Sequence, residues 1–298
     1  MRSNSPLALA LRRFKRHRLA MASFVVLVIL ITLVLLAGVI ESLLGVDATQ
    51  VNLMNRMAPA DSIHWLGTDE LGRDVAVRLL YGGRVSLFVG LTAALIAATI
   101  GTVIGLCAGY FGGRLDALLM RTTDSVLTLP TLPLLIVLAA IDLEKVLPSH
   151  LANSENVSFV RIVLIVALLG WTVVARLVRG ATLSLKERDF VLAAEGLGGG
   201  HGRIMFRHIL PNLLSPIIVA VTLSVGNVIL LESVLSFLGL GIQPPMASWG
   251  NMLTNAQETI WEAPMLAIWP GVFIFITVMC FNFLGDGLQD AFDPKAEY

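Results

Sequence analysis

The hydrophobic positions of this chain gather in continuous runs instead of alternating with polar positions. A helix of about 20 apolar residues crosses the core of a bilayer, whereas the strands of a membrane barrel alternate in polarity. Six runs of this kind are present, and we predict one transmembrane helix in each: Leu19–Leu44, Val85–Gly113, Val126–Ile141, Phe159–Val174, Ile209–Leu231 and Ala263–Leu284. The sequence therefore predicts an all-α polytopic membrane protein with six transmembrane helices.

Lys and Arg residues are distributed unevenly between the two ends of these helices. Six lie in the first 18 residues, two between the second and third runs, six between the fourth and fifth runs and one in the C-terminal tail. One side thus carries 15 of the 21 basic residues, the other carries five, and Arg161 lies at a membrane edge. Since cytoplasmic segments are enriched in Lys and Arg, we expect both termini to face the cytoplasm.

The composition excludes several classes of protein. Of the 298 residues, 56% are hydrophobic and only 14% are charged, with a formal net charge of zero and a mean hydropathy of +0.82. A soluble domain has roughly a quarter of its residues charged, and a nucleic-acid-binding protein has a basic excess. Both classes are disfavoured, as is a disordered chain, and we predict no nucleic-acid partner.

No catalytic or metal-binding pattern stands out. The chain has no metalloprotease, hydrolase or nucleotide-binding loop motif, and its five histidines all lie outside the apolar runs, with no two at a spacing of four. The two cysteines are far apart in apolar runs. We therefore predict no catalytic residue, no metal site and no cofactor bound by this chain.

The predicted transmembrane helices contain very few charges, whereas ion-driven transporters use intramembrane charges as relays. Glu232 is the main exception, and the length of the fifth run places it near the external surface. Two interpretations of Glu232 are open. In the first it is a polar group that lies at the membrane interface or faces the bundle, and in the second it lines a pathway. Asn227, in the same run, is a further candidate for a pathway or gate. The energy for any transport is thus expected to come from outside these helices.

Two other features lie within the apolar runs. Pro130 and Pro133 interrupt the third run, and each removes a helix hydrogen bond, so they either kink the helix as part of a pathway or gate or only delay its start. In the second run, Gly101, Gly105 and Gly109 recur every four residues. Three glycines on one face allow two helix backbones to approach closely, and we interpret them as packing residues.

The segment Lys186–Asn212, KERDFVLAAEGLGGGHGRIMFRHILPN, joins the fourth and fifth runs. It is polar enough to leave the membrane, yet its apolar residues from Phe190 to Leu197 form one face of a short helix, which Gly198 to Gly200 then end. Such a helix suits docking into a groove on a cytoplasmic partner. From the residues alone, an interfacial helix that lies on the membrane is an equal alternative.

This segment resembles the "EAA" loop of permease subunits of binding-protein-dependent ABC importers. The resemblance implies that the loop, with Leu192 and Glu195 inside it, docks on an ATPase and transmits its motion. Leu192 stands where the family has a glutamate, and Gly199–Gly202 stands where relatives carry a capping serine or an acidic residue. The matching positions are Ala193, Ala194, Gly198, His208, Leu210 and Pro211.

Three further segments resemble the dipeptide, oligopeptide and nickel permeases of that family: His64–Leu87, Leu235–Leu253 and Phe281–Pro294. The resemblance implies an inner-membrane importer subunit that works with a homologous second permease, two ATPase subunits that bind ATP and Mg²⁺, and an external substrate-binding protein. It implies residues 85–298 as a five-helix permease core, with the coupling loop at about 186–212, and residues 1–84 as an N-terminal tail, first helix and external segment. Peptides are the expected substrates. The alternatives are nickel or another metal chelate and, with less support, a secondary transporter or a membrane enzyme.

Overall fold

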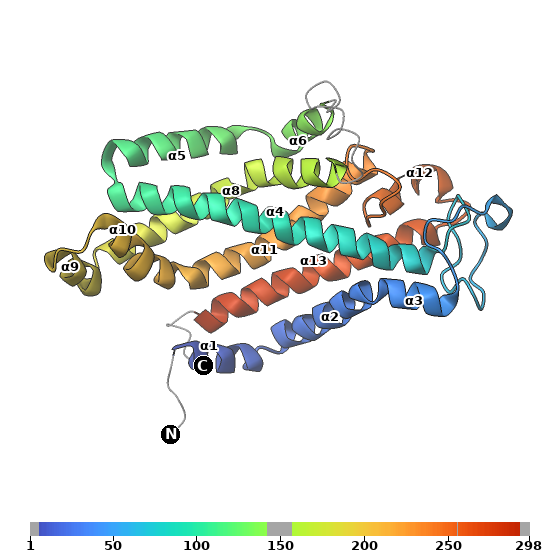
Figure 1. Ribbon diagram of the computed structural model, residues 1–298, viewed down its shortest axis with the longest axis horizontal. Coiled ribbons are helices and arrows are strands. Elements are labelled where there is room, and N and C mark those ends of the chain that lie inside the picture. The colour runs from blue at the N-terminus through green and yellow to red at the C-terminus, as the bar shows by residue number, and fades with distance from the viewer. Residues whose placement is uncertain (1–5, 142–156, 255, 293–298) are drawn as a thin grey trace.

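The computed structural model describes residues 6–141, 157–254 and 256–292, and within these ranges every regular element is a helix. Five helices are long and apolar enough to cross a membrane: α2 (Arg18–Leu35), α4 (Val75–Phe111), α8 (Val157–Lys186), α11 (Leu210–Phe237) and α13 (Met265–Phe292). They run side by side as one elongated bundle (Figure 1). The all-α polytopic membrane fold is confirmed, and five of the six predicted runs form long helices.

The third run is broken at its first proline, in agreement with the kink predicted there. The chain forms α5 (Gly113–Thr128) and α6 (Thr131–Ala139), and the two are bent by 84° at the break between them. Leu129 is extended there, as a residue before proline prefers to be, and Pro130 caps α6. Pro133 lies in the first turn of α6, where no helical N–H is needed. Within residues 6–141, 157–254 and 256–292, a sixth membrane crossing is present only if this bent pair is counted as one.

Two helices extend well beyond the predicted runs. Helix α4 begins at Val75 instead of Val85, because the Asp74 carboxylate caps it by accepting a hydrogen bond from the Val77 N–H at 2.8 Å. Its 37 residues span about 55 Å, far more than the roughly 30 Å of a bilayer core. Helix α8 continues to Lys186 instead of ending near Val174. Hydrophobicity therefore locates the part of each helix that lies in the bilayer core and does not locate the ends of the helix.

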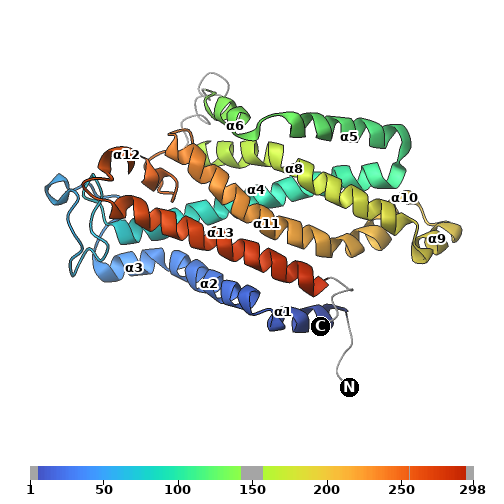
Figure 2. The same cartoon turned by 180° about the vertical axis from the view of Figure 1, so that it is seen from behind.

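The first run is also divided. Helix α2 ends at Leu35, and the chain continues as α3 (Ala37–Leu44), which ends at Gly45 in a left-handed conformation. A helix absent from the prediction, α1 (Pro6–Arg16), precedes α2. In Figure 2, α1 lies beside the end of α13, whereas α3 lies at the opposite end of the bundle.

The remaining elements are short. They are the 3₁₀ turns η1 (Leu53–Asn55) and η4 (Asn251–Leu253), the helices α9 (Asp189–Gly196), α10 (His201–Arg203) and α12 (Ala256–Thr259), and a π-helical segment, η3 (Ile204–Ile209). The π-helix joins α10 to α11 without a break, so that His201–Phe237 forms one helical rod.

The closest packing in the bundle joins α4 to α8 along the three glycines. A Cβ atom added at Gly101 would lie 2.5 Å from the Trp171 carbonyl oxygen, and one added at Gly105 would clash with the Ala175 carbonyl oxygen. At Gly109 it would lie 2.7 Å from Thr182 Cβ. Each glycine thus touches the α8 backbone or its first side-chain atoms, and the predicted packing role is confirmed.

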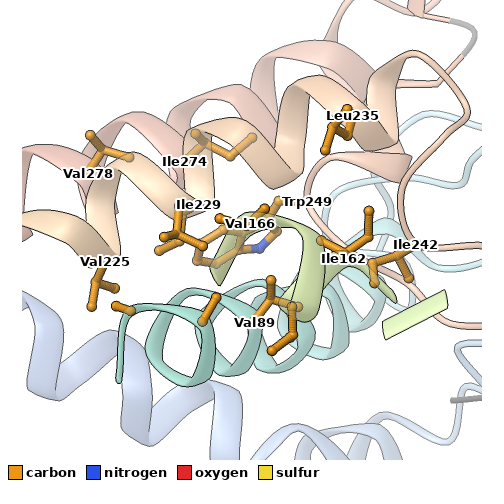
Figure 3. Packing of buried hydrophobic residues seen from close by; sticks show 14 of the residues in the cluster. Val89, Ile162, Val166, Val225, Ile229, Leu235, Ile242, Trp249, Ile274 and Val278 are labelled. Atoms are coloured by element: carbon orange, nitrogen blue, oxygen red, sulfur yellow. The ribbon is translucent and has the colours of Figure 1, made fainter. Parts of the chain in front are cut away.

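The main hydrophobic core lies between α4, α8, α11 and α13. In Figure 3, Trp249 reaches into it from the segment after α11 and lies among Val166 of α8, Ile229 of α11 and Ile274 of α13. Leu30 and Val34 of α2 belong to the same cluster of buried residues. The first transmembrane helix therefore shares a core with the others, while the proposed boundary at residue 85 stays a prediction.

We predict that Gly105→Ala destabilises the protein, whereas Gly180→Ala does not. The new Cβ at position 105 meets the fixed carbonyl of Ala175, while Gly180 of α8 has no atom within 4 Å of the equivalent position. Overpacking costs about 1–3 kcal/mol, whereas removing a glycine from an open helical position gains about 0.5–1 kcal/mol. Thermal unfolding of the two variants in the same detergent measures the difference, and equal melting temperatures would contradict it.

Candidate functional site

The loop between α8 and α11, residues 186–212, lies at one extreme end of the bundle. Figure 1 shows α9 and α10 projecting beyond the long helices at this end, far from α3 and α12. We call this segment the docking loop. It contains the residues that the sequence resemblance singled out, and the structure shows how each is held.

Helix α9 is attached to the bundle by one side only. Val191 is 2% exposed and packs in a small core with Val178 of α8, Ile204 of the π-helix and Leu213 of α11. The large apolar residues Phe190, Leu192 and Leu197 of the loop are exposed, and Leu197 is 90% exposed. Exposed apolar side chains gathered on one element mark a surface that contacts either another protein or the membrane.

A glycine turn ends α9 and fixes the direction in which the chain leaves it. Gly198 has φ +79°, a conformation that favours glycine. The N–H of Gly199 donates to the Ala194 carbonyl at 2.9 Å, and a Cβ at Gly199 would lie 2.7 Å from that oxygen. The departure from the family pattern at Gly199 therefore has a geometric reason, because a side chain there would obstruct the turn.

His201, within the second stretch that departs from the family pattern, anchors the docking loop to the end of α4. Its Nδ1 lies 2.9 Å from the Tyr110 hydroxyl, and its ring meets the rings of Tyr110 and Phe111 edge-on. The Lys186 ammonium donates to the Tyr110 carbonyl at 3.4 Å. Sequence reasoning missed this contact, and the only available signal was a lone histidine between glycines.

His208 and Pro211 lie where the π-helix passes into α11. Pro211 lies at the first turn of α11 and has no N–H to donate to the preceding turn. The Asn212 side chain donates to the His208 carbonyl at 2.7 Å. π-helical turns within α-helices occur frequently at functional sites, and this one lies within the docking loop, just before α11.

At the other end of the bundle, Glu232 is fully buried, with 0% of its surface exposed. Its carboxylate accepts hydrogen bonds from Ser236 Oγ at 2.7 Å and from Ser86 Oγ at 3.1 Å. Ser86 Oγ also accepts from the Trp249 N–H at 3.1 Å, and the Trp249 indole N–H donates to the Leu79 carbonyl at 2.9 Å. The cluster ties α4, α11 and the segment that carries Trp249 together. Within this chain Glu232 thus faces the bundle, and its role in a pathway or gate stays a prediction.

Asn227 lies apart from this cluster and lines a cavity of about 340 Å³ at the α5–α6 bend. Leu129 and Thr131, the neighbours of Pro130, line the same cavity, as do Ser224 of α11 and Thr172 of α8. Among the described residues, the cavity lining does not include Pro133 or Glu232. The structure thus brings Asn227 and the bend at Pro130 together and separates both from Glu232.

Comparison with known proteins identifies the family. The family model described as "Binding-protein-dependent transport system inner membrane component" matches residues 101–298. The chain belongs to this family. It is therefore a multi-pass component of the cytoplasmic membrane. A second model, "N-terminal TM domain of oligopeptide transport permease C", matches residues 5–59, which include α1 and α2.

Curated relatives match almost the whole of this family member. It is 38% identical to the oligopeptide transport system permease protein OppC of Bacillus subtilis over 96% of this chain and 88% of that protein. It is 39% identical to the dipeptide transport system permease protein DppC of Alkalihalophilus pseudofirmus over 98% of this chain and 90% of that protein. It is 40% identical to the oligopeptide transport system permease protein OppC of Escherichia coli K12 over 96% of this chain and 90% of that protein.

We predict that Glu232→Leu destabilises the protein by about 1–3 kcal/mol, whereas Glu232→Gln changes its stability by much less. Leucine removes the acceptor for two buried serine hydroxyls, and a buried polar group left without a partner costs this amount. Glutamine keeps the shape and one acceptor oxygen. Thermal unfolding in detergent compares the two variants with the wild type. A Glu232→Leu protein as stable as the wild type would show that the cluster does not hold the helices together.

Proposed function

We propose that this chain is one of two membrane subunits of an ATP-driven peptide importer, in which it forms the translocation pathway with a homologous second permease. Three relatives that align over nearly their full length are named oligopeptide or dipeptide permeases, which supports peptides over nickel or another metal chelate. An external substrate-binding protein would deliver the peptide. Hydrolysis chemistry belongs to two ATPase subunits that bind ATP and Mg²⁺.

The observation that carries this proposal is the exposed apolar surface of the docking loop. Leu197 is 90% exposed on an element that projects from the end of the bundle, and its neighbourhood is attached to the bundle through Val191 and His201. An apolar projection of this kind is suited to a groove on a cytoplasmic ATPase. The loop residues proposed to form the docking and coupling element are Leu192, Ala193, Ala194, Glu195, Gly198, His208 and Pro211.

Coupling follows from the way the docking loop continues into the bundle. The loop runs without a helical break from α10 through the π-helix into α11, which carries Asn227 and Glu232. A displacement of the loop by the ATPase subunits would therefore move α11 and change the cavity beside it. The pathway would be open either to the inside or to the outside of the cell. The population of each state would depend on the contacts that the ATPase subunits make with the loop before and after they bind ATP. This mechanism requires the docking loop to be cytoplasmic, in agreement with the distribution of basic residues.

The pathway is proposed to run past Asn227 and the bend at Pro130. Asn227 is exposed within the isolated chain and lies near the middle of α11, a candidate membrane-spanning helix. An amide that faces lipid there would be costly. Its exposure is explained if the cavity that it lines belongs to a water-filled route between this chain and the second permease. Pro133 and Glu232 would then affect the route only through the helices that they shape.

We predict that Leu197→Glu abolishes docking without affecting folding. The side chain has few contacts to lose, whereas a carboxylate in an apolar groove leaves a buried charge without a partner. The expected result is at least a 10-fold loss of ATPase co-purification and of ATP-driven peptide uptake in proteoliposomes. Met54→Glu is the matched control, since Met54 is 95% exposed on η1, outside the docking loop. Normal co-purification with Leu197→Glu would contradict the docking role.

We predict that a cysteine at position 227 is accessible to water in the assembled importer. In a Cys107→Ser background, Asn227→Cys should react with a membrane-impermeant maleimide at least 10-fold faster than Ile218→Cys, because only a hydrated thiol ionises. Ile218 is also exposed in the isolated chain but lies half a helical turn around α11 from Asn227. The remaining cysteine, Cys280, is buried. Equal labelling rates would place Asn227 outside the pathway.

A further inference from the structure

Helix α1 brings a group of basic side chains to the edge of the membrane. It ends at Arg16, and α2, a candidate membrane-spanning helix, begins at Arg18. The residues from Arg12 to Arg18 therefore lie directly before the apolar core. Basic side chains next to the end of a membrane-spanning helix extend to the headgroup layer of the bilayer. These side chains are thus placed to reach lipid phosphates.

The corner between α1 and α2 is fixed against the end of α13. His17 Nδ1 accepts a hydrogen bond from the Ala20 N–H at 3.1 Å, which leaves Nε2 to face the Asp290 carboxylate of α13 at 3.6 Å. Gly287 of α13 lies directly against Ala20. Figures 1 and 2 both show α1 alongside the end of α13. The orientation of α1 about its own axis is therefore set by packing.

This packing covers one face of α1 and leaves the basic face open. Ala10 is buried and Phe14 is half-buried, and these residues, four apart, share a face. Arg12 and Arg16 each lie two residues further along, about 200° around the helix, and both are exposed. Lys15 of α1 and Arg18, the first residue of α2, are also exposed. Among the described residues, none of these four cations has an acidic partner, whereas Asp290 lies on the covered side.

We propose that Arg12, Lys15, Arg16 and Arg18 form a binding site for the headgroup of an anionic phospholipid. Four exposed cations directly before a membrane-spanning helix, with their counter-charge absent from the described residues, complement a phosphate-bearing headgroup of net negative charge. The apolar start of α2, where Leu19 is exposed, provides the adjoining surface for the acyl chains. The lipid would thereby hold α1 to the corner of α2 and α13.

The test is lipid binding by the full-length chain purified in a mild detergent, followed by native mass spectrometry. The probes are phosphatidylglycerol and the zwitterionic phosphatidylcholine, and each is titrated at low and high ammonium acetate concentration. The wild type should bind the first phosphatidylglycerol at least 10-fold more tightly than phosphatidylcholine, and the difference should shrink at high ionic strength. Equal affinities for the two lipids would overturn the proposal.

Variants distinguish lipid binding at these four cations from a general attraction of anionic lipid to the basic residues of the chain. Arg12→Gln/Arg16→Gln should weaken phosphatidylglycerol binding by about 10-fold or more, while Arg12→Lys/Arg16→Lys should retain most of it. The matched control is Arg114→Gln/Arg121→Gln on α5, which removes two exposed cations from the same end of the bundle. Equal losses in the two Gln variants would overturn the proposal. If Arg12→Gln/Arg16→Gln fails to insert, the single variants Arg12→Gln and Lys15→Gln are compared with Arg114→Gln in the same way.

Discussion

The close contact of α4 with α8 is the constraint on which the rest of the bundle depends. Three glycines spaced by four residues let the α4 backbone touch the α8 backbone over two helical turns. In a membrane, where lipid is as apolar as a leucine side chain, such close packing is a main source of helix association. Helix α4 in turn contacts α2, α5 and α11. Because α4 reaches beyond the bilayer core at 37 residues, it also supports structures at both ends of the bundle.

The two ends use different physical interactions for this support. At the docking loop, Tyr110 and Phe111 of α4 hold His201 through one hydrogen bond and two edge-on ring contacts, all partly accessible to water. At the opposite end, Ser86 of α4 bonds to Glu232 inside a fully buried cluster. A hydrogen bond that competes with water is easily broken, whereas a buried carboxylate cannot lose its partners without a large penalty. The loop end is therefore the end suited to movement.

The sequence was sufficient to predict the features that depend on the transfer of apolar residues from water into the membrane and on short residue patterns. Continuous apolar runs located the long helices, the glycine spacing predicted the α4–α8 contact, and the docking loop was found by its motif. The sequence could not predict pairings between distant positions. Glu232 and Ser86 are 146 residues apart, and Tyr110 and His201 are 91 apart. Nor could it predict that the prolines of the third run would turn the chain by 84°, because that angle depends on the neighbouring helices.

The unbroken rod from His201 to Phe237 has a consequence for how the two ends are related. Each residue of an α-helix turns the chain by about 100°. The number of residues between the docking loop and Glu232 therefore sets the angle about the helix axis between the two. The π-helical segment Ile204–Ile209 contains more residues per turn and therefore changes that angle. A one-residue insertion or deletion anywhere between the loop and Glu232 would rotate one relative to the other, even where every contact nearby could adapt. The helix thus imposes a fixed length on this part of the chain, independent of the identity of its exposed side chains.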